Sequence, residues 1–395
     1  MDESIYIEIN CKQYNCKDNV VCGDVFLSNR IDSECRVLAV LSDGMGSGIK
    51  AGVLAMLTSS MALNFVKEHR SIRETAEIIM DTLPVCSERN ISYSTFTIVD
   101  IDFDYTVHIV EYDNPSCIIM RGGNIFTPRW EQIELSGEKH KDKVINICQF
   151  QAQIEDRIII MTDGVVQSGM GSLNHPFGWG HDEVELFIKK TIKRNVHISA
   201  SELSGNIVNE AVNFYDLGTA SDDTSSAVIY FRLPRELLVC TGPPYRKEYD
   251  HEFSKKFKDF QGKKIICGGT TIDIITRHLG LNYFIDTEVN DDELPPEVLI
   301  NGVSLATEGI LTLCKAAKML EEYNTSTSLG TGPADKIVSL FINSDKIHFI
   351  VGTGINKAHQ DPIITGGMDI RRNIVNKIAD ILTNKFLKQV SLEFI

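Results

Sequence analysis

The chain lacks several patterns that would assign it to a particular class of protein. Its 395 residues contain no apolar run near the ~20 residues that cross a bilayer, so we expect no membrane partner. The first ten residues, MDESIYIEIN, are acidic and alternate like a strand, which does not fit a secretory signal. A formal net charge of −15 argues against nucleic acid as a partner. Internal repeats and low-complexity tracts are also absent from the sequence.

The cysteines form no C-x-x-C pair, although there are ten of them. Most lie within apolar runs such as CRVLAV, which is typical of reduced thiols in a cytoplasmic protein core. Cys11, Cys16 and Cys22 lie close together near the start of the chain. Their spacing matches no standard zinc pattern and no histidine lies nearby, so a metal or redox role for them stays open.

The first part of the chain is rich in strand signals and has helices in pairs. Predicted strands cover 4–10, 20–28, 35–42, 94–102, 105–112, 116–121, 156–162 and 225–233, where β-branched or alternating residues are bounded by turn residues. Predicted helices cover 49–69, 72–83, 182–193 and 201–215, and the last follows a capping box, Ser199-Ala-Ser-Glu202. This pattern favours two antiparallel sheets flanked by helices, an α+β fold.

A boundary between two domains is predicted near residues 234–247, where two prolines and a glycine follow one another closely. We expect a first domain over 1–235 and a second over 248–395. In the second domain, strand-like and helix-like segments alternate, which indicates a smaller α/β domain. Its final helix, predicted over 370–388, is amphipathic and could pack on its own domain or on a second copy of the chain, so a homodimer is compatible with the sequence.

At four positions an aspartate stands at the turn beside a predicted strand, usually next to glycine. They occur in Cys22-Gly23-Asp24, Ser42-Asp43-Gly44, Thr162-Asp163-Gly164 and Ser221-Asp222-Asp223. A single Asp-Gly is most often only a turn, but four such sites beside strong strands are harder to explain in that way. Carboxylates brought together repel one another unless cations neutralise them. Oxygen ligands without histidine or cysteine favour magnesium or manganese over zinc.

The longest of these motifs, Asp43-Gly-Met-Gly-Ser-Gly48, must be distinguished from a dinucleotide-binding fingerprint. Its glycines have the spacing G-x-G-x-G, whereas the fingerprint requires G-x-G-x-x-G. No strand ending in an acidic residue follows about 20 residues later, as the fingerprint also requires. We therefore do not expect a dinucleotide at this position.

Taken together, the motifs resemble the PPM-type phosphatases of the stage II sporulation protein E class. The resemblance covers residues 1–233 and includes Cys-Gly-Asp24, Asp43-Gly-Met-Gly-Ser-Gly, Thr-Asp163-Gly and Asp222-Asp-Thr in the family's order. It implies a four-layer αββα sandwich with two Mn²⁺ or Mg²⁺ ions per phosphatase domain. By the same resemblance, Asp24, Asp43 and the Gly44 carbonyl would hold the bridged pair of ions. Asp163 and Asp222 would complete the coordination of the second ion, with Asp223 as a less certain ligand.

The expected activity is that of a bacterial-type phosphoprotein phosphatase in signal transduction. A water that bridges the two cations, held by Asp24 and Asp43, would attack phosphoserine or phosphothreonine on a partner protein. Two alternatives stay open at this point. One is an inactive phosphatase fold that serves as a docking or sensing module, and the other is a hydrolase of a small phosphorylated metabolite.

The second domain carries one candidate binding motif. Gly268-Gly269-Thr270-Thr271 follows an apolar run and begins a predicted helix, where backbone N–H groups could bind an anion. The threonine hydroxyls could equally satisfy these N–H groups themselves. We predict a regulatory or ligand-sensing role for the domain, with Gly268–Thr271 as its candidate site.

Overall fold

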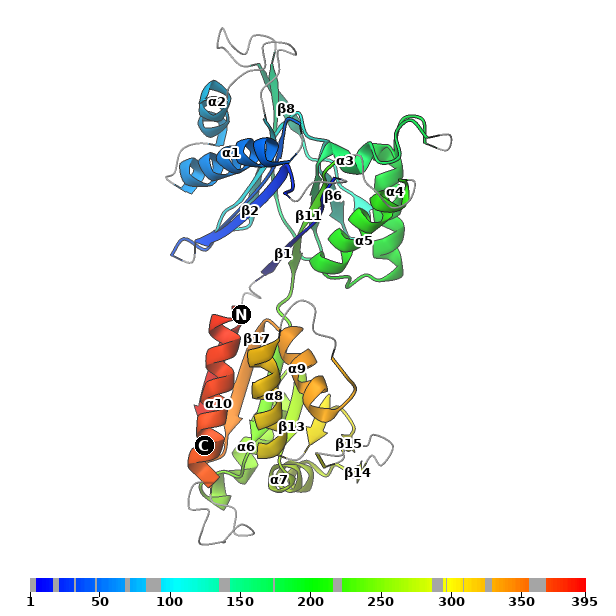
Figure 1. Ribbon diagram of the computed structural model, residues 1–395. Helices are drawn as coiled ribbons and strands as arrows, with labels where there is room; N and C mark the ends of the chain where they lie inside the picture. The colour runs from blue at the N-terminus through cyan, green and yellow to red at the C-terminus, as the bar shows by residue number, and fades with distance from the viewer. Residues whose placement is uncertain are drawn as a thin grey trace. The chain divides into compact units, whose positions relative to one another are not determined.

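The computed structural model divides the chain into two compact units, Met1–Leu233 and Pro234–Ile395 (Figure 1). The structure describes residues 5–16, 21–31, 33–46, 48–67, 72–82, 94–134, 143–172, 175–215, 222–285, 294–295, 297–307, 309–323, 329–354 and 367–395. Within these ranges, no helix is long and apolar enough to cross a membrane. The two units are described in turn.

Two antiparallel sheets form the centre of the first unit. Among the described residues, one sheet has the strand order β2 (Asp24–Ile31), β3 (Arg36–Gly44), β4 (Ser94–Ile101), β5 (Thr106–Tyr112), β9 (Val144–Gln151), β8 (Trp130–Glu134). The other has the order β1 (Tyr6–Tyr14), β11 (Thr224–Arg232), β10 (Arg157–Met161), β6 (Ile118–Arg121), β7 (Asn124–Ile125). The first is called the β2–β8 sheet below and the second the β1–β7 sheet.

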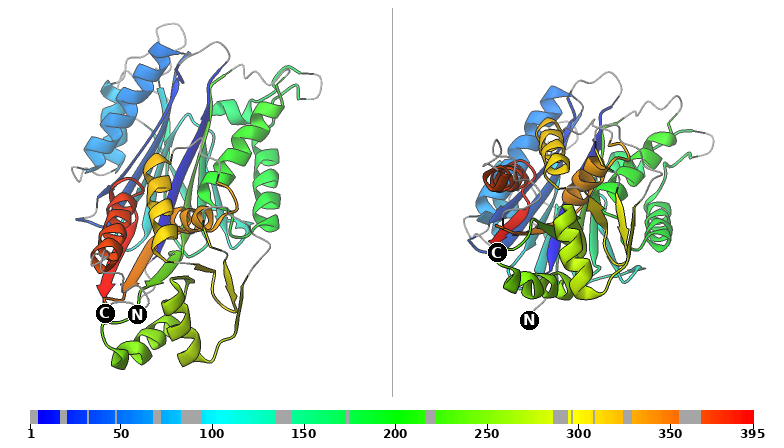
Figure 2. Two further views of the ribbon diagram at one scale, coloured as in Figure 1. Left: turned by 60° about the horizontal axis from the view of Figure 1, so that its bottom comes forward. Right: turned by 90° about the horizontal axis from the view of Figure 1, so that it is seen from below.

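Helices cover the outer face of each sheet. Helices α1 (Ile49–Lys67) and α2 (Ile72–Thr82) pack on the β2–β8 sheet, and α3 (Asp163–Val166), α4 (His181–Arg194) and α5 (Ala200–Asn213) pack on the β1–β7 sheet (Figures 1 and 2). This arrangement confirms the predicted αββα sandwich. The predicted capping box of α5 is also present, because Ser199 accepts a hydrogen bond from the Glu202 amide and the Glu202 side chain accepts one from the Ser199 amide.

The central strands are apolar on both faces because each of them borders two cores. In β3, Val37, Ala39 and Leu41 point into the core between the two sheets. The alternate residues Leu38 and Val40 belong to the core beneath α1 and α2. All five side chains are at most 4% exposed. The period-2 geometry of a strand therefore distributes one apolar run over two layers.

The second unit contains one mixed sheet with helices on both faces. Its order among the described residues is β14 (Tyr283–Ile285), β15 (Val298–Ile300), β16 (Leu305–Thr307), β13 (Lys263–Cys267), β12 (Glu236–Thr241), β17 (Lys346–Val351), β18 (Gln389–Phe394). The strands from β16 to β18 run parallel, and β14 and β15 are antiparallel additions. This confirms the predicted α/β class.

The helices of this unit cover both faces of the sheet. After the short 3₁₀ turn Lys247–Tyr249, α6 (Asp250–Asp259) and α7 (Gly269–Leu279) cover one face of the sheet. Helices α8 (Ile310–Glu322), α9 (Pro333–Ile342) and α10 (Gly367–Asn384) cover the other face (Figure 2, right). In chain order the parallel strands have the sequence 3-2-1-4-5, a doubly wound arrangement in which ligands bind at the carboxyl ends of the strands.

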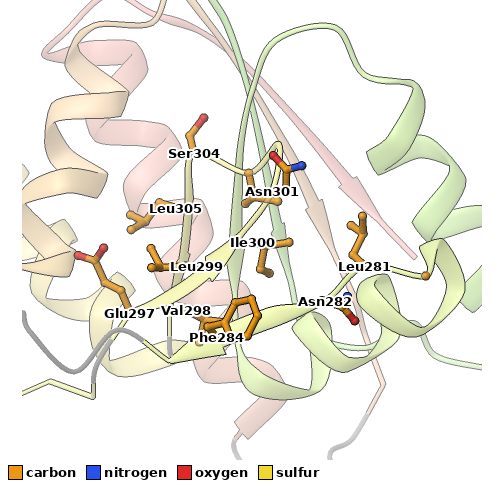
Figure 3. A pocket seen from close by; sticks show the side chains of 12 residues that line it. Leu281, Asn282, Phe284, Glu297, Val298, Leu299, Ile300, Asn301, Ser304 and Leu305 are labelled. Atoms are coloured by element: carbon orange, nitrogen blue, oxygen red, sulfur yellow. The ribbon is translucent and has the colours of Figure 1, made fainter.

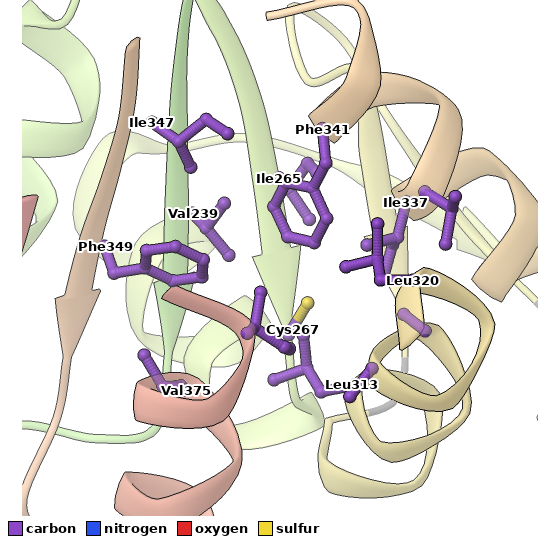
Figure 4. Packing of buried hydrophobic residues seen from close by; sticks show 14 of the residues in the cluster. Val239, Ile265, Cys267, Leu313, Leu320, Ile337, Phe341, Ile347, Phe349 and Val375 are labelled. Atoms are coloured by element: carbon purple, nitrogen blue, oxygen red, sulfur yellow. The ribbon is translucent and has the colours of Figure 1, made fainter. Parts of the chain in front are cut away.

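Two features of the second unit bear on the predicted domain boundary and on the predicted final helix. The segment that the prolines marked as a connection contains β12, the middle strand of the parallel set, whose Leu237 and Val239 lie in the core with Phe349 (Figure 4). The proline and glycine residues that suggested a linker come directly after this strand. The apolar face of α10, including Val375 and Ile378, is buried in the same core, so it is occupied within its own unit.

Candidate metal centre at the ends of the two sheets

The aspartates predicted from the sequence lie at the ends of strands from both sheets of the first unit. Asp24 begins β2 and lies opposite Asp43, near the end of β3, in the antiparallel register. Asp163 begins α3 directly after β10, and Asp222 and Asp223 come immediately before β11. Strands β2 and β3 belong to the β2–β8 sheet, whereas β10 and β11 belong to the β1–β7 sheet.

Hydrogen bonds between the sheets hold Asp24 in place. Asp24 is only 3% exposed, and its Oδ2 accepts hydrogen bonds from Thr162 Oγ1 at 2.9 Å and from Ser225 Oγ at 2.6 Å. Thr162 Oγ1 also accepts a hydrogen bond from the Ser225 amide at 3.0 Å. Neither hydroxyl was predicted as part of the site. The available signal was their position, since Thr162 precedes Asp163 and Ser225 follows closely after Asp223.

Burial, and then repulsion by neighbouring carboxylates, raises the pKa of Asp24, Asp43 and Asp222. Burial is the largest cause for Asp43, followed by the charges of Asp24, Asp163 and Asp222. Burial also raises the pKa of Asp24, although the hydrogen bonds that it accepts oppose the shift. Asp222 has its pKa raised to about 6, again by burial and then by Asp163. Close carboxylates of this kind favour the binding of cations.

Asp223 has a different environment from the other four aspartates. It is 3% exposed, and both of its carboxylate oxygens accept backbone hydrogen bonds. Oδ1 accepts from the Cys16 amide at 2.8 Å and Oδ2 from the Gly23 amide at 2.7 Å. These bonds fix the chain immediately before Asp24 and use one lone pair on each Asp223 oxygen.

Two of the glycines beside the aspartates are required by close backbone contacts. A Cβ atom on Gly44 would lie 2.0 Å from the Ala51 carbonyl oxygen in α1. A Cβ atom on Gly164 would lie 2.1 Å from the Asp223 carbonyl oxygen. Real Cβ atoms do not approach this closely, so only glycine allows β3 to approach α1 and α3 to approach the chain before β11. The Asp-Gly pairs are therefore packing requirements as well as turn signals.

The donor set fits hard divalent cations. The Oδ1 atoms of Asp24 and Asp163 are buried and have no hydrogen-bond partner in the described part of the chain. A buried carboxylate oxygen without a partner is costly unless a ligand completes its shell. Within the described ranges, no three His, Cys, Asp or Glu side chains could enclose one ion by themselves.

Two of the three N-terminal cysteines, Cys11 and Cys22, do not provide ready thiolates. The pKa of the Cys22 thiol is raised to about 12, by burial first and then by Asp24. The Cys11 pKa is also raised well above its usual value, mainly by burial. Thiols that stay protonated at neutral pH are poor nucleophiles and poor metal ligands.

A Cys-x5-Arg spacing, the pattern of the nucleophile loop in cysteine-dependent phosphatases, occurs at Cys240–Arg246 in the second unit. Cys240 lies within β12, is fully buried, and has its thiol pKa raised by desolvation. It packs in the apolar core between the sheet and the helices α6 and α7. This environment keeps Cys240 neutral and excludes it from that chemistry.

The motif predicted as a ligand site in the second unit lies at the start of α7. Gly268 is the N-cap residue with φ of 117°, a conformation that favours glycine, and Gly269, Thr270 and Thr271 form the first turn. No side chain caps this helix. The motif is therefore at a helix N-terminus on the carboxyl edge of the parallel strands, as expected from the sequence.

A hollow of about 520 Å³ lies elsewhere in the second unit, beside the β14–β15 hairpin (Figure 3). Its lining is largely apolar and includes Leu281, Phe284 and Leu299. The Glu297 carboxylate at its edge pairs with Lys336 at 2.8 Å.

Several solved structures are similar to the first unit in fold. The phosphatase domain of SpoIIE from Bacillus subtilis with a fragment of its regulatory domain is 19% identical, with 58% of this chain and 62% of that chain covered and a TM-score of 0.48. The same phosphatase domain in a crystal form without domain swapping is 17% identical, with 59% and 95% covered and a TM-score of 0.44. RsbX in complex with magnesium is 18% identical, with 58% and 98% covered and a TM-score of 0.41. No curated protein sequence matches the chain.

The αββα sandwich, with carboxylates at the ends of both sheets, defines a PPM-type phosphatase fold, a class whose members depend on Mg²⁺ or Mn²⁺. The profile of the Stage II sporulation protein E (SpoIIE) family matches residues 33–232, which is half of the chain. The chain therefore belongs to the SpoIIE family.

Proposed function

We propose that this chain is a metal-dependent phosphatase that hydrolyses phosphoserine or phosphothreonine on a signalling partner. One observation carries the proposal: carboxylates from both sheets meet, those of Asp24, Asp43 and Asp222 with raised pKa values, and two buried oxygens, Asp24 Oδ1 and Asp163 Oδ1, have no partner in the described part of the chain. A fold gains no stability from crowding like charges, so such a cluster points to a role in binding cations.

Two Mg²⁺ or Mn²⁺ ions would be held by Asp24, Asp43 and the Gly44 carbonyl. Asp163 and Asp222 would complete the coordination of the second ion. When bound, these ions would lower the pKa of a water toward neutrality and offset the charge of the phosphoryl oxygens. Asp223 is proposed as a positioning residue, because its two oxygens already accept backbone hydrogen bonds.

The remaining residues of the site would orient these ligands. Thr162 and Ser225 donate to one oxygen of Asp24 and leave the other for a cation. Gln167 Nε2 donates to Asp163 Oδ2 at 2.9 Å, and Asp163 Oδ1 is left in the same way. In both aspartates, one oxygen is fixed by the protein and the second is available. Such ligands lose little conformational freedom when a cation binds.

The substrate class rests on membership in the SpoIIE family and on no contact within the site. The profile of the Stage II sporulation protein E (SpoIIE) family, which supports this substrate class, covers residues 33–232. A protein partner is therefore proposed in preference to a small phosphorylated metabolite.

The test is manganese-dependent hydrolysis of an aryl phosphate by the full chain and by Asp43→Asn. We expect a loss of about 100-fold or more in Asp43→Asn, because a cation ligand is removed. Asp182→Asn, at the exposed start of α4, is the matched control and should keep the wild-type rate. Equal rates for wild type and Asp43→Asn would support the inactive docking module instead.

A second assay separates the two kinds of substrate. A phosphoserine peptide and a panel of phosphorylated metabolites are compared by kcat/KM under the same conditions. A phosphatase of proteins should favour the peptide, whereas a clear preference for one metabolite would contradict the proposed substrate class.

A further inference from the structure

The helices α7 and α8 of the second unit begin in the same way and side by side. Each has a glycine N-cap, Gly268 or Gly309, and each has a threonine three residues later, Thr271 or Thr312. A Cβ atom on Gly309 would lie 3.2 Å from the Gly268 Cα, so the two N-caps are in contact. The two helix N-termini thus share one position at the carboxyl edge of β13 and β16.

Both threonines carry a buried hydroxyl without a partner. Thr271 and Thr312 are fully buried, and neither Oγ1 has a hydrogen-bond partner in the described ranges. The Thr271 hydroxyl faces the N-cap, because it lies 3.3 Å from the place where a Cβ atom on Gly268 would be. Burying a hydroxyl without a partner is unfavourable, and a residue such as valine would fill the same volume without that penalty.

The electrostatics of this position favour an anion. Helix N-termini carry a partial positive charge, and two of them in contact repel each other unless a negative group lies between them. Neither α7 nor α8 has an acidic residue in its first turn or a side-chain cap. By contrast, α5, α6 and α9 each have an acidic residue in the first turn.

Open space and a cationic side chain, that of Arg371, are available at the same edge of the sheet. A Cβ atom on Gly269 would meet no atom within 4 Å, so the first turn of α7 is open on that side. Arg371, from α10, reaches the loops after β12 and β17, and its Nη1 lies 3.4 Å from the Gly352 carbonyl oxygen. Its Nε is buried without a partner among the described residues. The edge therefore combines positive groups with unused donors.

We propose that the second unit binds a phosphate-bearing small molecule where α7 and α8 begin. Its phosphate oxygens would accept hydrogen bonds from the first turns of the two helices and from the hydroxyls of Thr271 and Thr312. This site is separate from the aspartate cluster of the first unit and does not depend on phosphatase activity.

The test is isothermal titration of the full chain with inorganic phosphate and with ADP, in EDTA. Without metals the aspartate cluster repels anions, so the first unit does not contribute to binding. Wild type should bind one probe molecule per chain. Thr271→Val and Thr312→Val should each weaken binding about ten-fold or more, since each removes a hydrogen bond to a charged group.

The control is Thr276→Val in the same helix, because the Thr276 hydroxyl donates to the Ile272 carbonyl and does not face the N-terminus. It should bind as wild type does. Thr271→Val and Thr312→Val should fold as stably as wild type, so weaker binding would not reflect unfolding. No binding of either probe by wild type, or unchanged binding in both valine variants, would overturn the proposal.

Glu308, which precedes the N-cap of α8 in the sequence, lies outside the described residues and provides a further arm. Binding that appears only in Glu308→Gln would also overturn the proposal, because the chain's own carboxylate would then occupy the position. Binding by wild type that Glu308→Gln leaves unchanged would support it.

Discussion

Asp24 lies directly opposite Asp43 across the antiparallel pair β2–β3, so two acidic side chains start from neighbouring positions of one sheet. Like charges opposite each other destabilise a strand pair. Asp163 and Asp222, from the other sheet, add to the repulsion that Asp43 experiences. The predictions for the first unit follow from this arrangement.

The stability of the metal-free protein should fall as the pH rises. The pKa values of Asp24, Asp43 and Asp222 are raised in the folded state above the ordinary value near 4. Protons therefore bind more tightly to the folded chain, and the resulting stability is present at low pH and lost as these groups ionise. Thermal unfolding in EDTA should show that the transition temperature of the first unit falls by roughly several degrees between pH 5 and pH 8.

Divalent cations should reverse this trend. With excess Mn²⁺ the ionised carboxylates are the binding form, so the transition temperature should rise with added metal, and more so at pH 8 than at pH 5. The comparison uses the same buffers with and without metal. A metal-induced shift that is equal at both pH values would contradict the link between the ions and these aspartates.

Asp43→Asn should stabilise the metal-free protein while it lowers the activity. The substitution keeps the shape of the side chain and removes one of the mutually repelling charges, which we expect to add roughly 1–3 kcal/mol at pH 8. Urea unfolding in EDTA measures the change, with Asp182→Asn as the neutral control. A lower stability of Asp43→Asn would mean that repulsion at this position is already relieved within the chain.

Asp223→Ala should destabilise the first unit with or without metal. It removes the acceptor of two backbone hydrogen bonds, from Cys16 and Gly23, and we expect a loss of about 3 kcal/mol. Asp223→Asn keeps one acceptor oxygen and should show a smaller loss. If Asp223 were chiefly a cation ligand, both variants would instead be as stable as wild type in EDTA.

Gly164→Ala should disrupt the site through the backbone. Its Cβ would lie 2.1 Å from the Asp223 carbonyl oxygen, and the displacement needed is expected to cost about 3 kcal/mol or more. Gly205→Ala, inside α5, is the matched control, because its Cβ would meet nothing within 4 Å. That substitution should be neutral or stabilise the protein by up to about 1 kcal/mol. Urea unfolding of the two variants distinguishes a local clash from a general effect of removing glycine.

The sequence predicted the layers of the first unit because its strands and helices have clear periodicity and its aspartates lie at or beside strand ends. It did not predict β7, β8 or β9. The two-residue β7 (Asn124–Ile125) is too short for a pattern, and β8 (Trp130–Glu134) lacks the apolar residues of a buried strand. β9 (Val144–Gln151) does carry buried apolar residues, Ile145, Cys148 and Phe150, and was missed despite them. The sequence also did not show that Asp223 accepts bonds from Cys16 and Gly23, because these amides are about 200 positions away in the chain. Contacts over such separations depend on the pairing of β1 with β11, which no local pattern encodes.

In the second unit, composition near β12 was misleading for a physical reason. A parallel strand buried on both faces is a short apolar run, and periodicity alone does not identify it. The prolines after Thr241 marked the end of that strand, where the chain turns, and the same residues resemble a linker. The glycine turn at Gly268 was visible in the sequence, whereas its contact with Gly309 depends on the parallel pairing of β13 with β16.

The strands that border two cores have a further consequence for folding. In β10 and β11 nearly every side chain is buried, so a shift by one residue would exchange the faces without exposing apolar surface. Burial therefore selects the alignment of these strands only weakly. The hydrogen bonds from Thr162 and Ser225 to Asp24 exist in one alignment alone. The residues that prepare the site for chemistry would thus also help to choose the correct strand pairing, and their removal should slow folding as well as catalysis.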